Sequence, residues 1–263
     1  MTAEDSSTTT VLAEARRIVI KVGSSLLIDP ETRSARTSWL ASLARDIATL
    51  REEGAIVLLV SSGAVALGWR RLGIERSRQL DHRQAAAAVG QCQLMNAWAQ
   101  AFAPLDIPVG QLLLTLADSE STERSANARA TLSVLIGAGA VPVVNENDSV
   151  ATEELKLGDN DRLSARVAEL ADADLLLLLS DVDGLYSADP AKHADAELIP
   201  EVREITPEID RMAGAAGTPY GSGGMVTKLA AARIGMNAGC RTVIAAGSVE
   251  SPLAALEAGA RCT

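Results

Sequence analysis

The feature that most constrains the fold is a set of short segments that are apolar at every position. Residues 175–179 are all leucine, and residues 55–60 and 141–144 form similar runs. A strand with one face in water alternates apolar and polar residues, so strands without this alternation must be covered on both faces. Segments with helical periodicity separate these runs, at 38–53, 84–102, 122–136 and 225–238. We therefore expect a single-domain α/β protein, a three-layer αβα sandwich around a mostly parallel open sheet.

Chain length and charge narrow the functional classes. The chain has 263 residues, which is enough for one large α/β domain, and we expect that domain to span residues 15–263 after a flexible tail at 1–14. Acidic residues outnumber basic ones by 34 to 24, and aromatic residues make up only 2% of the chain. A net charge of −10 with few aromatic rings argues against general nucleic-acid or membrane binding.

The cysteines and the N-terminal residues indicate a cytoplasmic protein. Cys92, Cys240 and Cys262 are far apart and odd in number, which fits neither a disulfide framework nor a zinc site. The first residues are polar and acidic, unlike a signal peptide. The longest aliphatic run is too short to cross a bilayer.

Glycine, serine and lysine residues follow the predicted strands. In open α/β sheets, ligands bind at the carboxyl ends of the strands. Small residues at these positions allow backbone N–H groups and helix N-termini to approach an anion closely. The segments concerned are Lys21-Val22-Gly23-Ser24-Ser25, Ser61-Ser62-Gly63-Ala64, residues 145–148 and Ser180-Asp181.

Two further motifs lie at predicted helix starts. Residues 221–228 form a glycine-rich loop that leads into a helix and ends on Lys228. Such a loop is often only a flexible connection, and a lysine at a strand end, such as Lys21, is often a solvated charge. Both lysines lie beside glycine turns at the same predicted edge, which favours anion binding. The cluster Gly158-Asp159-Asn160-Asp161 suits a helix N-cap and could also direct a carboxylate at both lysines.

Other chemically reactive residue types are given simpler interpretations. His82 and His193 have polar, charged neighbours, and we expect them at the surface. Asp181 and Asp183 could bind a metal or simply form a turn. The tryptophans fall on predicted helices, where we expect them to pack in the interior: Trp39, Trp69 and Trp98.

Taken in order, these motifs resemble the amino acid kinase family and, within it, the glutamate 5-kinases. The resemblance extends from residue 18 to about residue 259. The lysine–glycine turn, Asp183-Gly184-Leu185-Tyr186, Asp189-Pro190 and residues 223–228 resemble the wider family. The segments that resemble glutamate 5-kinases in particular are 21–25, 61–64, Ala87-Ala88-Val89-Gly90-Gln91, 143–148 and 158–161.

The resemblance implies ATP-dependent phosphorylation of the γ-carboxylate of L-glutamate to γ-glutamyl phosphate, the first step of proline biosynthesis. By match to the family motifs, Lys21 and Lys228 would contact the transferred phosphoryl group, and Asp161 would hold both lysines. The residues that would bind glutamate are Ser62, Asp148, Asn160 and, less directly, Asn145. The residues that would hold ATP are Lys21, Ser180, Asp181, Ser222, Gly223, Gly224, Met225, Val226, Thr227 and Lys228.

The resemblance also implies Mg²⁺ with the ATP, feedback inhibition by proline, and a homo-oligomer, either a dimer or a tetramer. Many bacterial members carry a C-terminal domain of an RNA-binding type, and we expect none in this chain, which stops at Thr263. The sequence assigns no metal ligands. Two alternatives remain: a kinase for N-acetylglutamate, aspartate or carbamate, and a non-catalytic module that binds a nucleotide or an amino acid.

Overall fold

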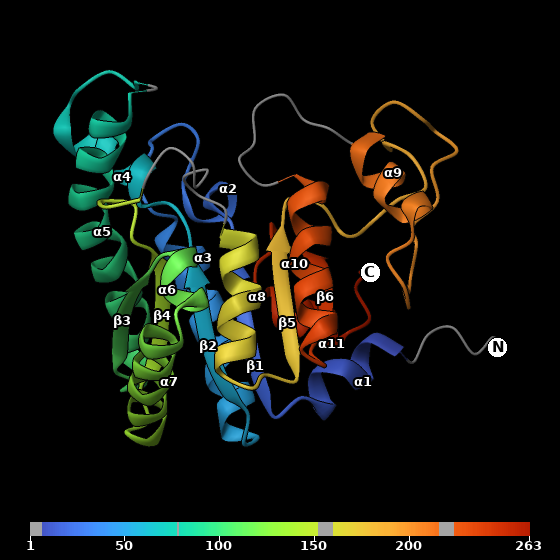
Figure 1. The fold of residues 1–263 in the computed structure, drawn as a ribbon, viewed down its shortest axis with the longest axis horizontal. Helices are drawn as coiled ribbons and strands as arrows, with labels where there is room; N and C mark the ends of the chain where they lie inside the picture. Colours follow the sequence, from blue (N-terminus) through green and yellow to red (C-terminus); the bar gives the residue numbers. More distant parts are fainter. Residues whose placement is uncertain (1–6, 78, 152–159, 216–223) are drawn as a thin grey trace.

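In the described part of the chain, the fold is built on one sheet of six parallel strands, in the order β3-β4-β2-β1-β5-β6 (Figure 1). The computed structural model describes residues 7–77, 79–151, 160–215 and 224–263. The strands are β1 (Arg17–Val22), β2 (Ile56–Ser61), β3 (Val109–Leu114), β4 (Val141–Glu146), β5 (Leu175–Ser180) and β6 (Arg241–Ala246). The parallel sheet expected from the apolar runs is therefore confirmed.

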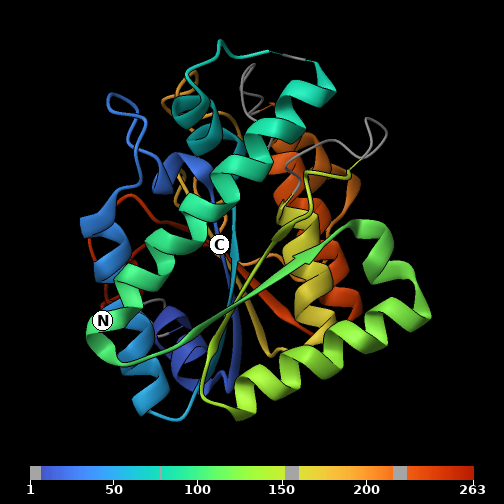
Figure 2. The same ribbon diagram turned by 90° about the vertical axis from the view of Figure 1, so that its left-hand side faces the viewer.

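Helices cover both faces of this sheet, as Figure 2 shows. One face packs against α1 (Ser7–Glu14), α3 (Thr37–Glu52), α5 (Leu80–Phe102) and α11 (Pro252–Glu257). The other packs against α7 (Thr122–Gly137), α8 (Asn160–Leu170) and α10 (Met225–Asn237). The remaining helices are α2 (Ser24–Leu27), α4 (Ala64–Leu72), α6 (Leu116–Glu120), α9 (Pro207–Ala215) and the short 3₁₀ turn Ala103–Leu105. Across the described ranges, no helix is long and apolar enough to cross a bilayer.

Successive residues of β1 supply the two halves of the core. Ile18 and Ile20 point into the cluster that contains α3 and α5, whereas Val19 points into the cluster that contains α8 and α10. Because strand side chains alternate between faces, Lys21 lies on the same face as Val19. The strand thus delivers one ammonium group to the α8–α10 side of the sheet, at its carboxyl edge.

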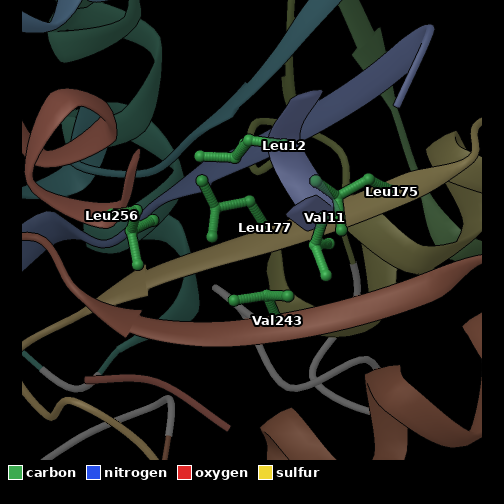
Figure 3. Close-up of a pocket in the computed structure, with 6 residues that line it drawn as sticks. All are labelled: Val11, Leu12, Leu175, Leu177, Val243 and Leu256. Carbon is green, nitrogen blue, oxygen red and sulfur yellow. The ribbon is translucent and has the colours of Figure 1, made fainter. Parts of the chain in front are cut away.

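The N-terminal segment differs from the flexible tail that we expected. Residues Ser7–Glu14 form α1, and Leu12 is buried. Val11 and Leu12 close an apolar pocket together with residues from β5, β6 and α11, namely Leu175, Leu177, Val243 and Leu256 (Figure 3). Burial of these apolar side chains stabilises the docking of α1 against the sheet. The polar residues around them in the sequence did not indicate this docking. Residues 1–6 lie outside the described part of the chain.

The three tryptophans are buried, as expected, and two of them tie helices to the sheet. The indole N–H of Trp39 on α3 donates to the carbonyl of Gly247, at 2.8 Å. That of Trp98 on α5 donates to Oγ of Ser61 at the end of β2, at 2.9 Å. Both helices are thereby positioned relative to the carboxyl edge of the sheet.

Helices α4 and α5 cross at the smallest separation that their backbones allow. A Cβ atom added to Gly90 on α5 would lie 1.7 Å from the carbonyl oxygen of Ala64. A Cβ atom added to Gly68 on α4 would lie 1.7 Å from that of Ala86. Real Cβ atoms do not approach backbone oxygens so closely, so only glycine fits at either position. This crossing fixes residue 91, the next residue of α5, relative to the segment that begins α4.

The crossing predicts an asymmetry between two glycine substitutions. Gly90→Ala should lower the free energy of unfolding by about 3 kcal/mol, because the helices must separate to admit the methyl group. Gly137→Ala is the matched control, since no atom lies within 4 Å of its added Cβ; it should leave stability unchanged or raise it by about 0.5 kcal/mol. Urea unfolding measures both. Equal stability of the Gly90→Ala protein and the unsubstituted chain would disprove the tight crossing.

Candidate active site

Two lysine side chains, distant in the sequence, converge on one carboxylate. Nζ of Lys21 lies 2.5 Å from Oδ1 of Asp161, and Nζ of Lys228 lies 3.4 Å from Oδ2 of the same residue. All three side chains are buried: Lys21 is 7% exposed, Lys228 4% and Asp161 1%. The proximity expected from the glycine turns is confirmed, and the charges share one enclosed region.

Three elements bring these side chains together. Lys21 is the fifth residue of β1 and faces α8 and α10, while Asp161 occupies the first turn of α8. Lys228 lies in the first turn of α10, which packs directly on α8. Because the carboxyl end of β1 and the amino ends of both helices meet at the upper edge of the sheet in Figure 1, the charges converge there.

Asp161 is held as an anion. Burial alone would raise the pKa of its carboxyl group, but Lys21 and Lys228 outweigh that effect and lower the pKa below its usual value. The hydroxyl of Thr227 donates to Oδ2 at 2.6 Å and supports the same charge state. Burial lowers the pKa of Lys228, and the neighbouring charge of Lys21 lowers it further, while Asp161 opposes both effects. Lys228 is therefore a buried amine whose positive charge is supported chiefly by Asp161.

A row of side-chain amides runs from the lysine centre along the edge of the sheet. Nδ2 of Asn160, next to Asp161, donates to Oγ of Ser62 at 2.8 Å and to Oδ1 of Asn145 at 3.0 Å. Nδ2 of Asn145 in turn donates to Oε1 of Gln91 at 2.8 Å. We call Asn160, Asn145 and Gln91 the amide row. Ser62, Asn145 and Asn160 thus lie together, as the sequence predicts.

Asp148 lies just beyond the end of β4 and is unusually situated for a carboxylate. It is only 7% exposed, and among the described residues its Oδ1 atom has no hydrogen-bond partner. Burial raises the pKa of Asp148 to about 6, although the positive charge of Arg83 acts in the opposite direction. A carboxylate in this state gains strongly from a cationic ligand.

The structure describes some, but not all, of the residues that the sequence predicts to bind ATP. Ser180 ends β5 and is buried, and its hydroxyl donates to Oδ1 of the exposed Asp181 at 3.0 Å. Gly224, Met225, Val226 and Thr227 lie at or within the start of α10, next to Lys228. Ser222 and Gly223 lie outside the described residues. The hydroxyl of Thr227 is bonded to Asp161, a role that its place in the loop did not suggest.

The histidines and Asp183, which were given simpler interpretations, have ordinary surroundings. His82 and His193 are exposed, as expected. Asp183 accepts a hydrogen bond from the Tyr186 hydroxyl at 3.0 Å, which supports the turn interpretation. Within the described ranges, no three His, Cys, Asp or Glu side chains cluster to hold a metal ion.

Comparison with known proteins agrees with the geometry. Residues 16–246 match the model of the amino acid kinase family. The glutamate 5-kinase of Paramagnetospirillum magneticum is 56% identical over 96% of this chain and 68% of its own length. That of Caulobacter vibrioides is 58% identical over 95% of this chain and 67% of its own length.

Solved structures support the fold. An isopentenyl phosphate kinase matches with a TM-score of 0.61 at 19% identity, over 93% of this chain and 97% of the other. The UMP kinase of Ureaplasma parvum matches with a TM-score of 0.62 at 17% identity, over 94% of this chain and 97% of the other. At these identities, the likeness concerns the arrangement of strands and helices.

The buried charge centre predicts a large stability effect at Asp161. Asp161→Asn should lower the free energy of unfolding at pH 7 by about 3 kcal/mol, because it leaves two buried ammonium groups without their counter-charge. Asp172→Asn is the control, since it breaks an exposed pair with Arg129 at 2.6 Å and should change stability by less than about 1 kcal/mol. Chemical denaturation measures both variants. Similar small losses in the two proteins would mean that Asp161 does not neutralise the lysines.

Proposed function

Because the chain belongs to the amino acid kinase family and matches glutamate 5-kinases over nearly its whole length, we propose that its lysine centre transfers the γ-phosphoryl group of ATP to the side-chain carboxylate of L-glutamate. The product is γ-glutamyl phosphate, the first intermediate of proline synthesis. The observation that carries the proposal is the convergence of Lys21 and Lys228 on Asp161, beside a row of amides and a buried carboxylate.

The chemistry requires cations and has no need of a general base. A glutamate side chain has a pKa of about 4.3, so its carboxylate is already an anionic nucleophile at neutral pH. One of its oxygens forms a bond to the γ-phosphorus as the bond to the β–γ bridging oxygen breaks, and ADP leaves with that electron pair. The obstacle is repulsion between anions, about 4 kcal/mol per pair of unit charges 4 Å apart at an effective dielectric constant near 20.

Lys21 and Lys228 offset this repulsion. Their ammonium groups are compact point charges that can follow the phosphoryl group from donor to acceptor. Asp161 holds both in position before the substrates arrive, and the Thr227 hydroxyl fixes the carboxylate in turn. This arrangement is already oriented for the transition state, which is where electrostatic stabilisation contributes most to rate.

The other end of glutamate meets Asp148 and the amide row. A buried carboxylate with an unbonded oxygen suits the α-ammonium group of the amino acid. Ser62 and Asn160 are hydrogen-bonded to each other at 2.8 Å next to Asp161, where they would orient the substrate near the lysines. N-acetylation would replace the ammonium by a neutral amide, so Asp148 favours glutamate over N-acetylglutamate.

ATP is held between the carboxyl end of β5 and the start of α10. The first N–H groups of a helix have no partner within the helix and bind phosphate well, and α10 begins beside Lys228. Mg²⁺ would neutralise the phosphate oxygens when bound. It commonly keeps several waters and uses one or two carboxylates together with the phosphates, and Asp181 is the exposed carboxylate next to Ser180.

Two features of the proposal rest on the family resemblance. Proline carries the same charged nitrogen and carboxylate on one carbon atom as glutamate does, so it would compete for Asp148 and act as a feedback inhibitor. Assembly into a homo-oligomer, a dimer or a tetramer, is proposed on the same basis. Both remain separate from the phosphoryl-transfer step, which uses residues of one chain.

The direct test of function is ADP release in the presence of ATP and Mg²⁺. Release should depend on L-glutamate and should be far slower with N-acetylglutamate or aspartate as the acceptor. A preference for either of those acceptors would assign the chain to another activity in the family. ATP binding without any acceptor-dependent release would indicate a non-catalytic nucleotide-binding module.

The lysine assignment predicts a loss of turnover rather than of binding. Lys21→Met and Lys228→Met should each lower kcat by about 10²- to 10³-fold while changing the Kd for ATP by less than about tenfold. Lys192→Met is the control, because Lys192 is exposed and pairs with Asp189 at 2.9 Å; it should behave as the unsubstituted chain. Near-normal kcat in either active-site variant would remove that lysine from the transfer step.

The elevated pKa of Asp148 predicts how glutamate binding depends on pH. The pKa of Asp148 is about 6, so at lower pH its carboxyl group is protonated. The carboxyl group must then lose a proton before it can pair with the ammonium group of glutamate. The KM for glutamate should therefore rise by about tenfold per pH unit below pH 6 and stay constant above pH 7. Asp148→Asn should raise KM and remove this dependence between pH 5 and 8. A parallel pH profile in both proteins would contradict the assignment.

A further inference from the structure

Gln91 is buried in the site, yet the NH₂ group of its side-chain amide has no hydrogen-bond partner in the described structure. The residue is only 9% exposed, and Oε1 accepts from Nδ2 of Asn145. In the described structure, Nε2 is buried without any hydrogen-bond partner. A buried N–H donor left unpaired destabilises a protein, so such a group is well explained by a ligand that supplies the missing acceptor.

The direction of the hydrogen bonds shows what each end of the amide row offers. Oδ1 of Asn145 accepts from the backbone N–H of Glu146 at 2.8 Å as well as from Asn160, so its Nδ2 must face Gln91. Gln91 therefore binds Asn145 through its oxygen and presents its NH₂ group elsewhere. At the opposite end, Oδ1 of Asn160 is a buried acceptor that no described atom satisfies.

These unsatisfied atoms match the polarity of an amino acid. Oδ1 of Asn160 and Oδ1 of Asp148 are acceptors and suit the three N–H bonds of an ammonium group. Nε2 of Gln91 is a donor and suits a carboxylate. The row leads from Asp161 through Asn160 and Asn145 to Gln91, so Gln91 is the member farthest along the row from the phosphoryl-transfer centre.

We propose that Gln91 is a specificity residue whose Nε2 group donates a hydrogen bond to the α-carboxylate of the amino acid substrate. This proposal rests on the proposed function and adds a contact to it. The γ-carboxylate must reach the lysines, which leaves the α-carboxylate as the acceptor for the distant end of the row. Gln91 thereby distinguishes an α-amino acid from a substrate that has only the reacting carboxyl group.

The backbone explains why this position is so well defined. Gly90 precedes Gln91 and allows α5 to touch α4 at the carbonyl of Ala64. Ala64 follows Gly63 and Ser62, and Ser62 accepts from Asn160 in the same row. The segment Ala87-Ala88-Val89-Gly90-Gln91 thus combines a close helix crossing with a substrate-facing amide.

Two substitutions separate substrate contact from a purely structural role. Gln91→Glu keeps an oxygen for Asn145 but replaces the donor by a second oxygen, which repels a carboxylate. Gln91→Leu removes both groups. At pH 8, substrate contact predicts that kcat/KM for glutamate falls by about 10-fold or more in the leucine variant and further in the glutamate variant, mostly through KM. The KM for ATP should change little, and Gln93→Leu on the same helix should be neutral.

The opposite order of the two variants would overturn the proposal. If Gln91 only orients Asn145, Gln91→Glu retains that contact and stays close to the unsubstituted protein, whereas Gln91→Leu is the weaker enzyme. The α-amide of glutamate provides a second readout: its kcat/KM relative to that of glutamate should rise at least tenfold in Gln91→Glu, and an unchanged ratio also refutes the contact. Failure of the proposed function is distinct, because the unsubstituted chain would then not phosphorylate glutamate at all.

Discussion

The site depends on one buried carboxylate that holds two ammonium groups near each other. Without Asp161, Lys21 and Lys228 would repel one another in a region with little water, and burial would favour loss of a proton from Lys228. With it, both ammonium groups have a counter-charge and are held in position before any substrate binds. The helices that carry these residues pack together, so the geometry of α8 and α10 is part of the electrostatic arrangement.

Around this centre, the other polar side chains of the site offer different groups to a ligand. In the proposed mechanism the lysines contact the phosphoryl group, while the amide row extends along the sheet edge and Asp148 offers an acceptor to a cation. The reacting group of glutamate is already ionised, so the protein needs charge compensation and orientation rather than proton transfer. This accounts for a site made of lysines, amides and hydroxyls, with both histidines at the surface.

The sequence was sufficient for the sheet and for the neighbourhood of the site. Apolar runs identify strands such as β5 because a segment without polar positions can only be buried on both faces. Glycine turns predict the edge where Lys21 and Lys228 meet, because parallel strands end on the same side. Individual side-chain contacts are harder to predict from the sequence. The bond from Thr227 to Asp161, the pairing of Asn145 with Gln91 and the docking of Val11 and Leu12 depend on tertiary positions that no local pattern encodes.

In the proposed mechanism, both ammonium groups contact the phosphoryl group during transfer. A crystal structure with ADP, Mg²⁺, aluminium fluoride and L-glutamate tests it most directly, because the planar fluoride stands in for the migrating group. In that complex, Nζ of Lys21 and Nζ of Lys228 should both lie within about 3 Å of the fluoride ligands, with Asp161 still between them. A complex in which either lysine points away from the fluoride, with glutamate bound elsewhere, would contradict it.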